Sequence, residues 1–531
     1  MNMQIRSWRP IDGDVGVRET ADAVCTFLDV AATALGRATH YNTREDQERA
    51  ELASHGALFA IDRGLYAALL LLPGVSDRAR ALGVRSLLSQ PRPSETGAAW
   101  LDANAERAVI EALVEALPSQ RAIKLLAGLG AARVNNARTR KLILRTLLGS
   151  PRLELWSVKY RSKLHDALVH AWGRKTATHL RELLSTPVGE RTPQQRQTLQ
   201  RLIGKYAKDR ARIARECVGF VLGASLAPTL PLLVAYEDAK SDLARGARLP
   251  LEVLEGIRST YHPQVERKAL LELAKGAMTK TQRRQLQRVA AEAGVSVTMD
   301  PKDYGVIELY VYALEMGVSV EIAQALVAKA RKAAAAFPVR YARVGVLVDA
   351  SASMAGHASQ KRRPMAVTLA LRDMLQRVGD QQRTVYCGGA LQIDEALSAT
   401  GFAGLVEPEG ETSLAEGLLE LLDVVEAERP EVIYVLSDGY ENAPAGRFDE
   451  VVCELRGIGV DVPIYHLSPV FAAESGGVRS LSPKLSTLPV ARPDALGLSF
   501  LRGLVEAEPL RGIQALLRAA LMIENSSEVS P

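Results

Sequence analysis

The feature that most constrains this chain is an apolar run ending in alternating polar residues, Val344-Gly-Val-Leu-Val-Asp-Ala-Ser-Ala-Ser353. A continuous Val and Leu run predicts a strand buried on both faces of a parallel sheet. In open α/β sheets, ligands collect just beyond the carboxyl ends of such strands. Asp349, Ser351 and Ser353 stand at that end, and their hard oxygen atoms suit Mg²⁺ or Mn²⁺. The run therefore predicts a metal site at the edge of a parallel sheet.

Two later segments offer further oxygen ligands. Gly410-Glu-Thr-Ser-Leu-Ala-Glu-Gly417 opens a predicted amphipathic helix and contains Thr412. Val432-Ile-Tyr-Val-Leu-Ser-Asp-Gly439 predicts a second buried strand, which ends on Asp438. By itself, an Asp-x-Ser-x-Ser sequence is more often a helix cap or a turn than a set of ligands. Matching residues at two strand ends and one helix start favour the metal site here.

These five residues resemble the metal-ion-dependent adhesion site of von Willebrand factor A domains, whose pattern is Asp-x-Ser-x-Ser, then a Thr, then an Asp. The resemblance implies a doubly wound, Rossmann-like α/β domain over residues 339–531. It implies that three residues hold the ion and that two complete its shell directly or through water: Asp349, Ser351 and Ser353, then Thr412 and Asp438. In that family the open metal position accepts a carboxylate from a protein partner, so the site binds and does not catalyse.

Residues 1–338 predict a succession of short helices. Amphipathic segments are closed by Gly or Pro within a few residues, and Thr43-Arg-Glu-Asp46 predicts a capping box. Residues 193–217 predict one longer helix. The uncharged residues 217–236 contain Pro228 and Pro231, which favour two buried helices joined by a turn over a membrane span. Short helices with short connectors predict an α-helical, HEAT-like repeat domain, although no fixed period is visible.

The positive charge of the chain is concentrated in one segment. Residues 120–216 contain 22 Lys and Arg against 6 Asp and Glu, a net charge of +16, whereas residues 341–531 contain 16 against 26, or −10. Solvated surfaces normally mix the two signs, so this excess indicates a polyanionic partner.

Amide and aromatic side chains are interleaved with these charges, a combination that suits RNA. Trp156, Tyr160 and Trp172 could stack on RNA bases, or they could belong to the helix core beside a solvated basic face. For each of these three residues we favour the helix core. The run Lys205-Tyr-Ala-Lys-Asp-Arg-Ala-Arg212 is also basic. The candidate RNA-binding residues are Arg133, Asn135, Asn136, Arg138, Arg140, Lys141, Lys159, Arg161, Lys163, Arg174 and Lys175.

A basic helical region followed directly by an A domain resembles the Ro autoantigen and its bacterial relatives, the TROVE-module proteins. The segment Leu155-Trp-Ser-Val-Lys-Tyr-Arg-Ser-Lys-Leu-His-Asp-Ala-Leu-Val-His-Ala-Trp172 is similar in character to the basic helix of that family. The resemblance implies an RNA-binding scaffold of ribonucleoprotein quality control. Its helices would hold small noncoding, misfolded or single-stranded RNA, and its A-domain metal would recruit a protein partner.

Two other classes of protein fit the same layout. Helices followed by an A domain are also found in adaptors of MoxR-type AAA+ ATPases, whose helices bind protein clients, and a purely structural protein-binding solenoid is a third class. The local basic excess favours RNA. The sequence contains no nucleophile–base pair, phosphate-cradling loop or carboxylate dyad, so we expect no enzyme activity.

The remaining features place the chain in the cytoplasm. Cys25, Cys217, Cys387 and Cys453 lie far apart, which predicts neither a zinc site nor a disulfide framework. No targeting segment is visible. We therefore expect a cytoplasmic protein that does not contact membranes and is monomeric apart from RNA and its protein partner. Near the C-terminus, residues 475–497 predict a long Ser/Pro/Gly-rich loop, residues 493–519 the final helices, and residues 525–531 a frayed tail.

Overall fold

The computed structural model describes residues 13–34, 36, 43–91, 101–292, 294–295, 297, 299–337, 339–357, 361–393, 395–470 and 479–526. A helical N-terminal region is followed by a C-terminal parallel sheet with helices, as the sequence predicts. The chain forms two compact units. The first contains residues 1–80, 95–109 and 301–531, and the second contains residues 81–94 and 110–300. Residue 338 lies outside the described residues, and the division into residues 1–338 and 339–531 stays a prediction.

Five parallel strands form the sheet of the first unit, in the order β2-β1-β5-β6-β7. Strand β1, the first of the two predicted strands, is an inner strand of this sheet, and it pairs with β2 from Tyr341 opposite Gly379 to Asp349 opposite Cys387. A separate antiparallel pair joins β3 and β4. The bounds are β1 Tyr341–Asp349, β2 Gly379–Cys387, β3 Leu391–Gln392, β4 Leu405–Val406, β5 Val432–Leu436, β6 Ile464–Ser468 and β7 Ser486–Pro489.

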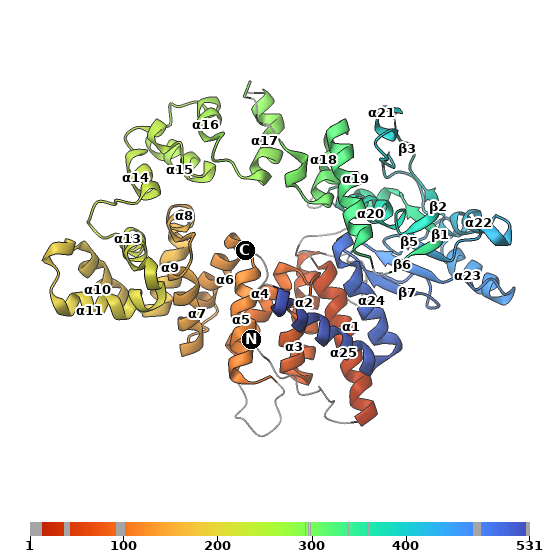
Figure 1. Cartoon of the computed structure of the whole chain (residues 1–531), viewed down its shortest axis with the longest axis horizontal. Coiled ribbons are helices and arrows are strands. Elements are labelled where there is room, and N and C mark those ends of the chain that lie inside the picture. Colours follow the sequence, from red (N-terminus) through yellow and green to blue (C-terminus); the bar gives the residue numbers. More distant parts are fainter. Residues whose placement is uncertain are drawn as a thin grey trace. The chain divides into compact units, whose positions relative to one another are not determined.

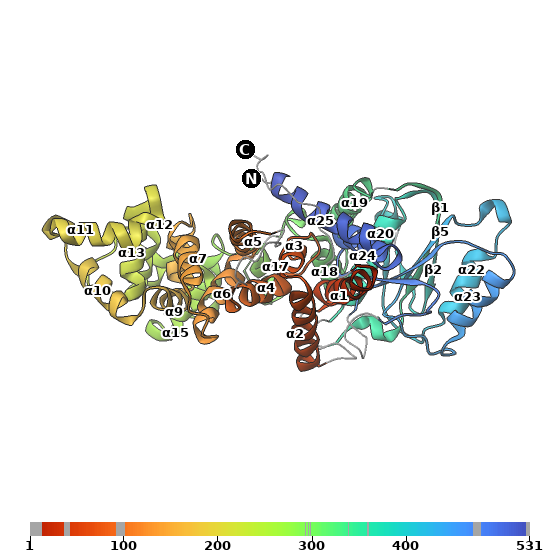
Figure 2. The ribbon, with the colours of Figure 1, turned by 90° about the horizontal axis from the view of Figure 1, so that it is seen from below.

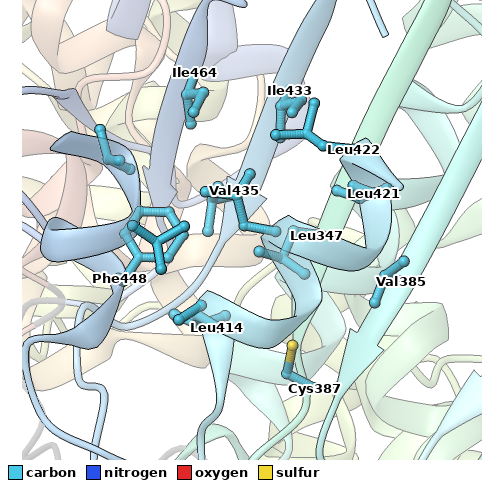
Figure 3. Packing of buried hydrophobic residues seen from close by; sticks show 14 residues of the cluster. Leu347, Val385, Cys387, Leu414, Leu421, Leu422, Ile433, Val435, Phe448 and Ile464 are labelled. Atoms are coloured by element: carbon cyan, nitrogen blue, oxygen red, sulfur yellow. The ribbon is translucent and has the colours of Figure 1, made fainter. Parts of the chain in front are cut away.

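Helices α22 and α23 cover one face of this sheet, and α20 and α24 lie on the other (Figure 2). On the first face, Leu414 of α22, Phe448 of α23 and Val435 of β5 belong to one fully apolar cluster (Figure 3). On the second face, α20 is buried along nearly its whole length, because it packs between the sheet and helices α18 and α19. These two layers pack on both faces of the sheet and bury the ends of β1 and β5.

The N-terminal helices belong to the same compact unit as the sheet, a relationship that the sequence does not reveal. Helix α1 packs against α24, α25 and β7. Asp29 of α1 accepts two hydrogen bonds from the guanidinium group of Arg502 in α24, at 2.9 and 3.0 Å.

Within the described residues, thirteen helices lie wholly or partly in this unit, and two of them, α4 and α5, continue into the second unit. Their bounds are α1 Gly13–Thr33, α2 Arg44–Ile61, α3 Arg63–Leu69, α4 Asp77–Ser89, α5 Ala103–Ala116, α18 Val306–Met316, α19 Val320–Ala335, α20 Arg363–Leu375, α21 Glu395–Ser398, α22 Leu414–Leu422, α23 Arg447–Gly457, α24 Leu496–Ala507 and α25 Pro509–Ser526.

The second unit consists of short helices that pack both on the next helix along the chain and on helices further along it (Figure 1). Helix α6 packs on α9, for example, and α10 packs on α13. The helices are α6 Ser119–Ala131, α7 Ala137–Leu148, α8 Leu153–Lys159, α9 Arg161–Trp172, α10 Arg174–Ser185, α11 Pro193–Leu199, α12 Lys205–Ala207, α13 Ala211–Leu222, α14 Pro231–Asp238, α15 Leu251–Tyr261, α16 Arg267–Ala274 and α17 Lys280–Glu292.

Several local predictions can be compared with these elements. The capping box at Thr43 and Asp46 is confirmed. Residues 217–236 contain the end of α13 and the start of α14, with Gly223 in the left-handed region between them, as predicted. No helix among the described residues is long and apolar enough to span a membrane. All four cysteines are free.

Two predictions differ from the structure. The single helix predicted over residues 193–217 is broken by a π-helical turn, Gln200–Gly204, and a 3₁₀ turn, Lys208–Arg210, where Lys208 has a positive φ of 51°. The loop predicted over residues 475–497 contains β7, a short strand that pairs with β6 at the edge of the sheet formed by the described strands. Residues 471–478 and 527–531, which include part of that loop and most of the predicted tail, lie outside the described residues.

Candidate functional site

The end of β1 lies where the direction of strand addition reverses. The chain passes from β1 to its neighbour β2 on one side, and later to β5 on the other side. In open α/β sheets, such a point forms a crevice at the carboxyl ends of the strands, and ligands bind there. Strand β1 ends at Asp349, and Ser437 and Asp438 directly follow β5. The sheet therefore brings both predicted acidic residues to the same edge.

Backbone and side-chain hydrogen bonds join the three loops that carry the predicted metal residues. Ala352 N donates to Gly410 O at 3.2 Å, linking the loop after β1 to the loop before α22. Ala443 N donates to Thr412 O at 3.2 Å, and Thr412 N donates to Asn442 Oδ1 at 2.9 Å. These two bonds link the Thr412 loop to the loop after β5. The five predicted residues thus lie on one connected set of loops.

The hydrogen bonds around Asp349 fix the orientation of its carboxylate. Ser351 N donates to Asp349 Oδ1 at 3.0 Å, and Ser437 Oγ donates to Asp349 Oδ2 at 2.6 Å. The hydroxyls of Ser351 and Ser353 are 3.1 Å apart. Asp349 and Ser351 are buried, whereas Ser353 is partly exposed. The loop therefore holds one carboxylate and two hydroxyls together, with one hydroxyl side chain reaching the surface.

The electrostatics of the loop set suit a cation. Burial raises the pKa of Asp349 to about 7, and the negative charge of Asp438 also contributes to raising it. Asp438 is itself 1% exposed, and its Oδ1 accepts a hydrogen bond from Tyr440 N at 3.1 Å. Two buried carboxylates that repel one another are stabilised when a cation binds them. With the hydroxyls of Ser351 and Thr412, every donor atom is an oxygen, the ligand type that Mg²⁺ prefers.

The site differs from a metal centre built mainly of acidic, histidine or cysteine ligands. Among the described residues, no group of three or more His, Cys, Asp or Glu side chains is arranged to hold a metal ion. The loops at the end of β1 contribute two carboxylates, and the other oxygens come from Ser and Thr. This donor set fits a hard divalent ion held partly through hydroxyls, and such an ion would supply a positive charge to bind an anionic group.

Sequence reasoning missed the residues that support this site. His466 of β6 is fully buried, and its Nε2 lies 3.1 Å from Ser437 O. Because a carbonyl oxygen only accepts, Nε2 must donate, and Nδ1 contacts Thr487 Oγ1 at 3.1 Å. Glu441 accepts hydrogen bonds from Ala415 N and Phe448 N near the starts of α22 and α23. Of these supporting residues, only Ser437 lies beside a residue that the sequence predicts to belong to the site, namely Asp438.

The predicted RNA-binding residues fall into two groups in the second unit. One group is engaged within the protein. Asn136 caps α7 by accepting from Thr139 N at 2.9 Å, and Arg138 donates to the carbonyls of Leu87 and Gln90. Lys159 pairs with Glu252 at 3.1 Å, and the Arg161 guanidinium lies 4.4 Å from the centre of the Phe220 ring. These four residues therefore have structural roles.

The other group is exposed. Five of these basic side chains make no ion pair or side-chain hydrogen bond among the described residues: Arg140, Lys141, Lys163, Arg174 and Lys175. Arg133 and Asn135 are also exposed, and Arg133 has a positive φ of 56° in the turn between α6 and α7. We call the first five residues the exposed basic set. Their charges are available to an external anion.

The aromatic residues of the basic segment differ in burial. Trp156 is 7% exposed, which confirms the core interpretation for this residue, and Tyr160 and Trp172 are half-buried. His170 contacts Val134 O at 3.0 Å through Nε2, whereas His165 is exposed. The Trp156 ring is therefore covered by the fold, whereas the rings of Tyr160 and Trp172 are partly accessible from outside.

No protein-family model matches this sequence, and no curated protein matches it either. Two features of the chain bear on its function: the hydrogen-bonded loops after β1, before α22 and after β5, and the exposed basic set.

Proposed function

We propose that this protein is an RNA-binding scaffold of the Ro type, with a HEAT-like TROVE region and a von Willebrand factor A domain. The observation that carries the proposal is the exposed basic set, five cations without carboxylate partners among the described residues, in a segment with a net charge of +16. Unpaired cations on one segment are suited to a polyanion, because each phosphate contact releases a condensed counterion. The ligand would be small noncoding, misfolded or single-stranded RNA.

The proposed role of the α/β domain is to recruit a protein partner. Asp349, Ser351 and Ser353 would hold Mg²⁺ or Mn²⁺, with Thr412 and Asp438 completing the shell. The ion would then bind a carboxylate of the partner. The support for this role is the all-oxygen donor set on three hydrogen-bonded loops. The protein would act by binding, without a catalytic step.

The proposal is tested by identifying what the protein binds in cells. The protein is crosslinked by ultraviolet light, purified at low salt, and the attached nucleic acid is sequenced while the crosslinked peptides are mapped. We expect discrete small RNAs crosslinked within residues 120–216. Recovery of protein free of nucleic acid, together with a MoxR-type AAA+ ATPase, would contradict the RNA proposal and support the adaptor function instead.

A further inference from the structure

An exposed arginine lies beside the loops that carry the predicted metal residues. A Cβ atom at position 439 would lie 2.5 Å from Arg479 O and 3.0 Å from Arg479 Cβ. Gly439 directly follows Asp438 and has a positive φ of 87°, so a residue without a Cβ atom is what admits this close approach. The backbone of Arg479 therefore lies against the neighbour of a predicted metal ligand.

The side chain of Arg479 is held by the next residue of the same loop. Its guanidinium carbon lies 3.8 Å from the centre of the Tyr440 ring, and Tyr440 N donates to Asp438 Oδ1 at 3.1 Å. A cation–π contact of this kind uses the flat face of the guanidinium group and leaves the N–H donors at its edge available. Arg479 is exposed and makes no ion pair within the described part of the chain. Its charge is therefore accessible to an external carboxylate.

A series of polar contacts ties the following residue, Ser480, to the same strand ends. Thr487 Oγ1 of β7 lies 3.1 Å from Ser480 Oγ and 3.1 Å from His466 Nδ1. His466 Nε2 contacts Ser437 O at 3.1 Å, and Ser437 Oγ donates to Asp349 Oδ2 at 2.6 Å. The fold therefore fixes the segment that begins with the exposed arginine relative to the predicted metal ligand at the end of β1.

The exposed charges on the loops around the predicted metal position differ in sign. On the loop before α22, Glu409 and Glu411 are exposed, and neither makes an ion pair among the residues that the structure describes. At the loop after β5, Arg479 lies against Gly439 and Tyr440. A partner segment with one carboxylate on the ion would have a second carboxylate repelled by the two glutamates and attracted by Arg479. The second carboxylate is therefore favoured beside the loop after β5.

We propose that Arg479 is a specificity-determining residue that selects a protein segment with two acidic residues, one for the metal ion and one for its own guanidinium group. This inference rests on the proposed recruitment of a protein partner through the metal. Guanidinium groups bind carboxylates through two parallel hydrogen bonds. Because Arg479 lies on the ring of the second residue after Asp438, we expect one to three residues between the two acids, which span about 7–13 Å in an extended chain.

The first experiment selects peptides from a random phage-displayed library on the purified protein in Mg²⁺ and elutes them with EDTA. It compares wild type, Arg479→Gln and the control Lys484→Gln. Lys484 is also exposed, but it lies just before β7, at the opposite end of the parallel strands. We expect two acidic residues at a fixed spacing in peptides from wild type and the control, and one in peptides from Arg479→Gln. Single-acid peptides from all three proteins would overturn the role of Arg479. No EDTA-eluted peptide from any of them would overturn recruitment through the metal as well.

The second experiment measures the affinity of a selected two-acid peptide in Mg²⁺ by fluorescence anisotropy. Replacing the second acid by its amide should weaken binding about 5-fold in wild type and Lys484→Gln, but less than about 1.5-fold in Arg479→Gln. Equal losses in wild type and Arg479→Gln would overturn the pairing while leaving carboxylate binding at the metal intact.

Isothermal titration calorimetry then checks that Arg479 acts on the partner and not on the ion. The Mg²⁺ affinity of Arg479→Gln should stay within about 2-fold of wild type, because a nearby cation does not help to hold a metal ion. A loss of Mg²⁺ affinity of about 10-fold or more would mean that Arg479 supports the metal site itself, which would overturn its role in selecting the partner.

Discussion

Ser437 donates a hydrogen bond to Asp349 Oδ2 at 2.6 Å, which joins the end of β5 to the end of β1. His466 in turn contacts the carbonyl oxygen of Ser437 from β6. The carboxylate of Asp349 is thus oriented by residues of two neighbouring strands. A metal ligand that is oriented in this way before the ion arrives loses less freedom on binding.

Ser437→Ala should weaken Mg²⁺ binding by about 10-fold, because Asp349 would lose the hydrogen bond that orients it. Isothermal titration calorimetry measures the affinity. Ser413→Ala is the matched control, because the Ser413 hydroxyl is buried near the start of α22 and has no hydrogen-bond partner within the described part of the chain. If the two variants bind Mg²⁺ as wild type does, Ser437 has no part in orienting the ligand.

Asp349→Ala should abolish Mg²⁺ binding but change the RNA affinity by less than about 2-fold, because the exposed basic set lies in the other compact unit. Fluorescence anisotropy with single-stranded RNA checks the second part. A large loss of RNA affinity would instead mean that the two functions are coupled.

Asp29→Asn should change how stability depends on pH. Burial raises the pKa of Asp29 from 3.8 to about 6, although the charge and hydrogen bonds of Arg502 lower it. In wild type the folded state therefore binds this proton more tightly than the unfolded state, and the contribution to stability is lost as the pH rises from about 4 to 6. The change across this window is of the order of 1–3 kcal/mol. Denaturant unfolding at a series of pH values should give a more positive slope for Asp29→Asn; an unchanged slope would contradict the assignment.

Lys208→Gly should stabilise the protein relative to Lys208→Ala by about 1–2 kcal/mol. The positive φ of 51° at Lys208 strains a residue with a side chain, and glycine adopts it freely. The two variants lose the same charge, so their difference in unfolding free energy isolates the strain. Equal stabilities would show that the backbone at position 208 relaxes without cost.

The positions of Asp349 and Asp438 at the ends of two buried strands could be predicted from the sequence, because these signals are local. Residues 344–348 of β1 and the whole of β5 are unbroken apolar runs, and Asp349 and Asp438 stand at or just beyond their ends. The supporting contacts were not predictable, since His466 reaches Ser437 from a strand 29 residues away. The contact of Arg161 with Phe220 and the pairing of Lys159 with Glu252 likewise join distant segments. A basic run therefore identifies the charged segment, whereas only the fold separates its structural cations from its exposed ones.

The central claim is tested most directly by the salt dependence of RNA affinity. The five-site variant replaces the exposed basic set, Arg140, Lys141, Lys163, Arg174 and Lys175, with alanine. Its control replaces five exposed cations that are paired with carboxylates, Arg44, Arg49, Arg145, Arg245 and Lys275. Both variants lose five charges, and exposed ion pairs contribute little to stability.

We measure the dissociation constant for single-stranded RNA between low and physiological salt by fluorescence anisotropy. If all five exposed residues contact phosphates, the slope of log K against log salt should become shallower by about 3.5 in the five-site variant, whereas the control should keep nearly the slope of wild type. Identical slopes in wild type and the five-site variant would contradict the claim that the exposed basic set binds RNA.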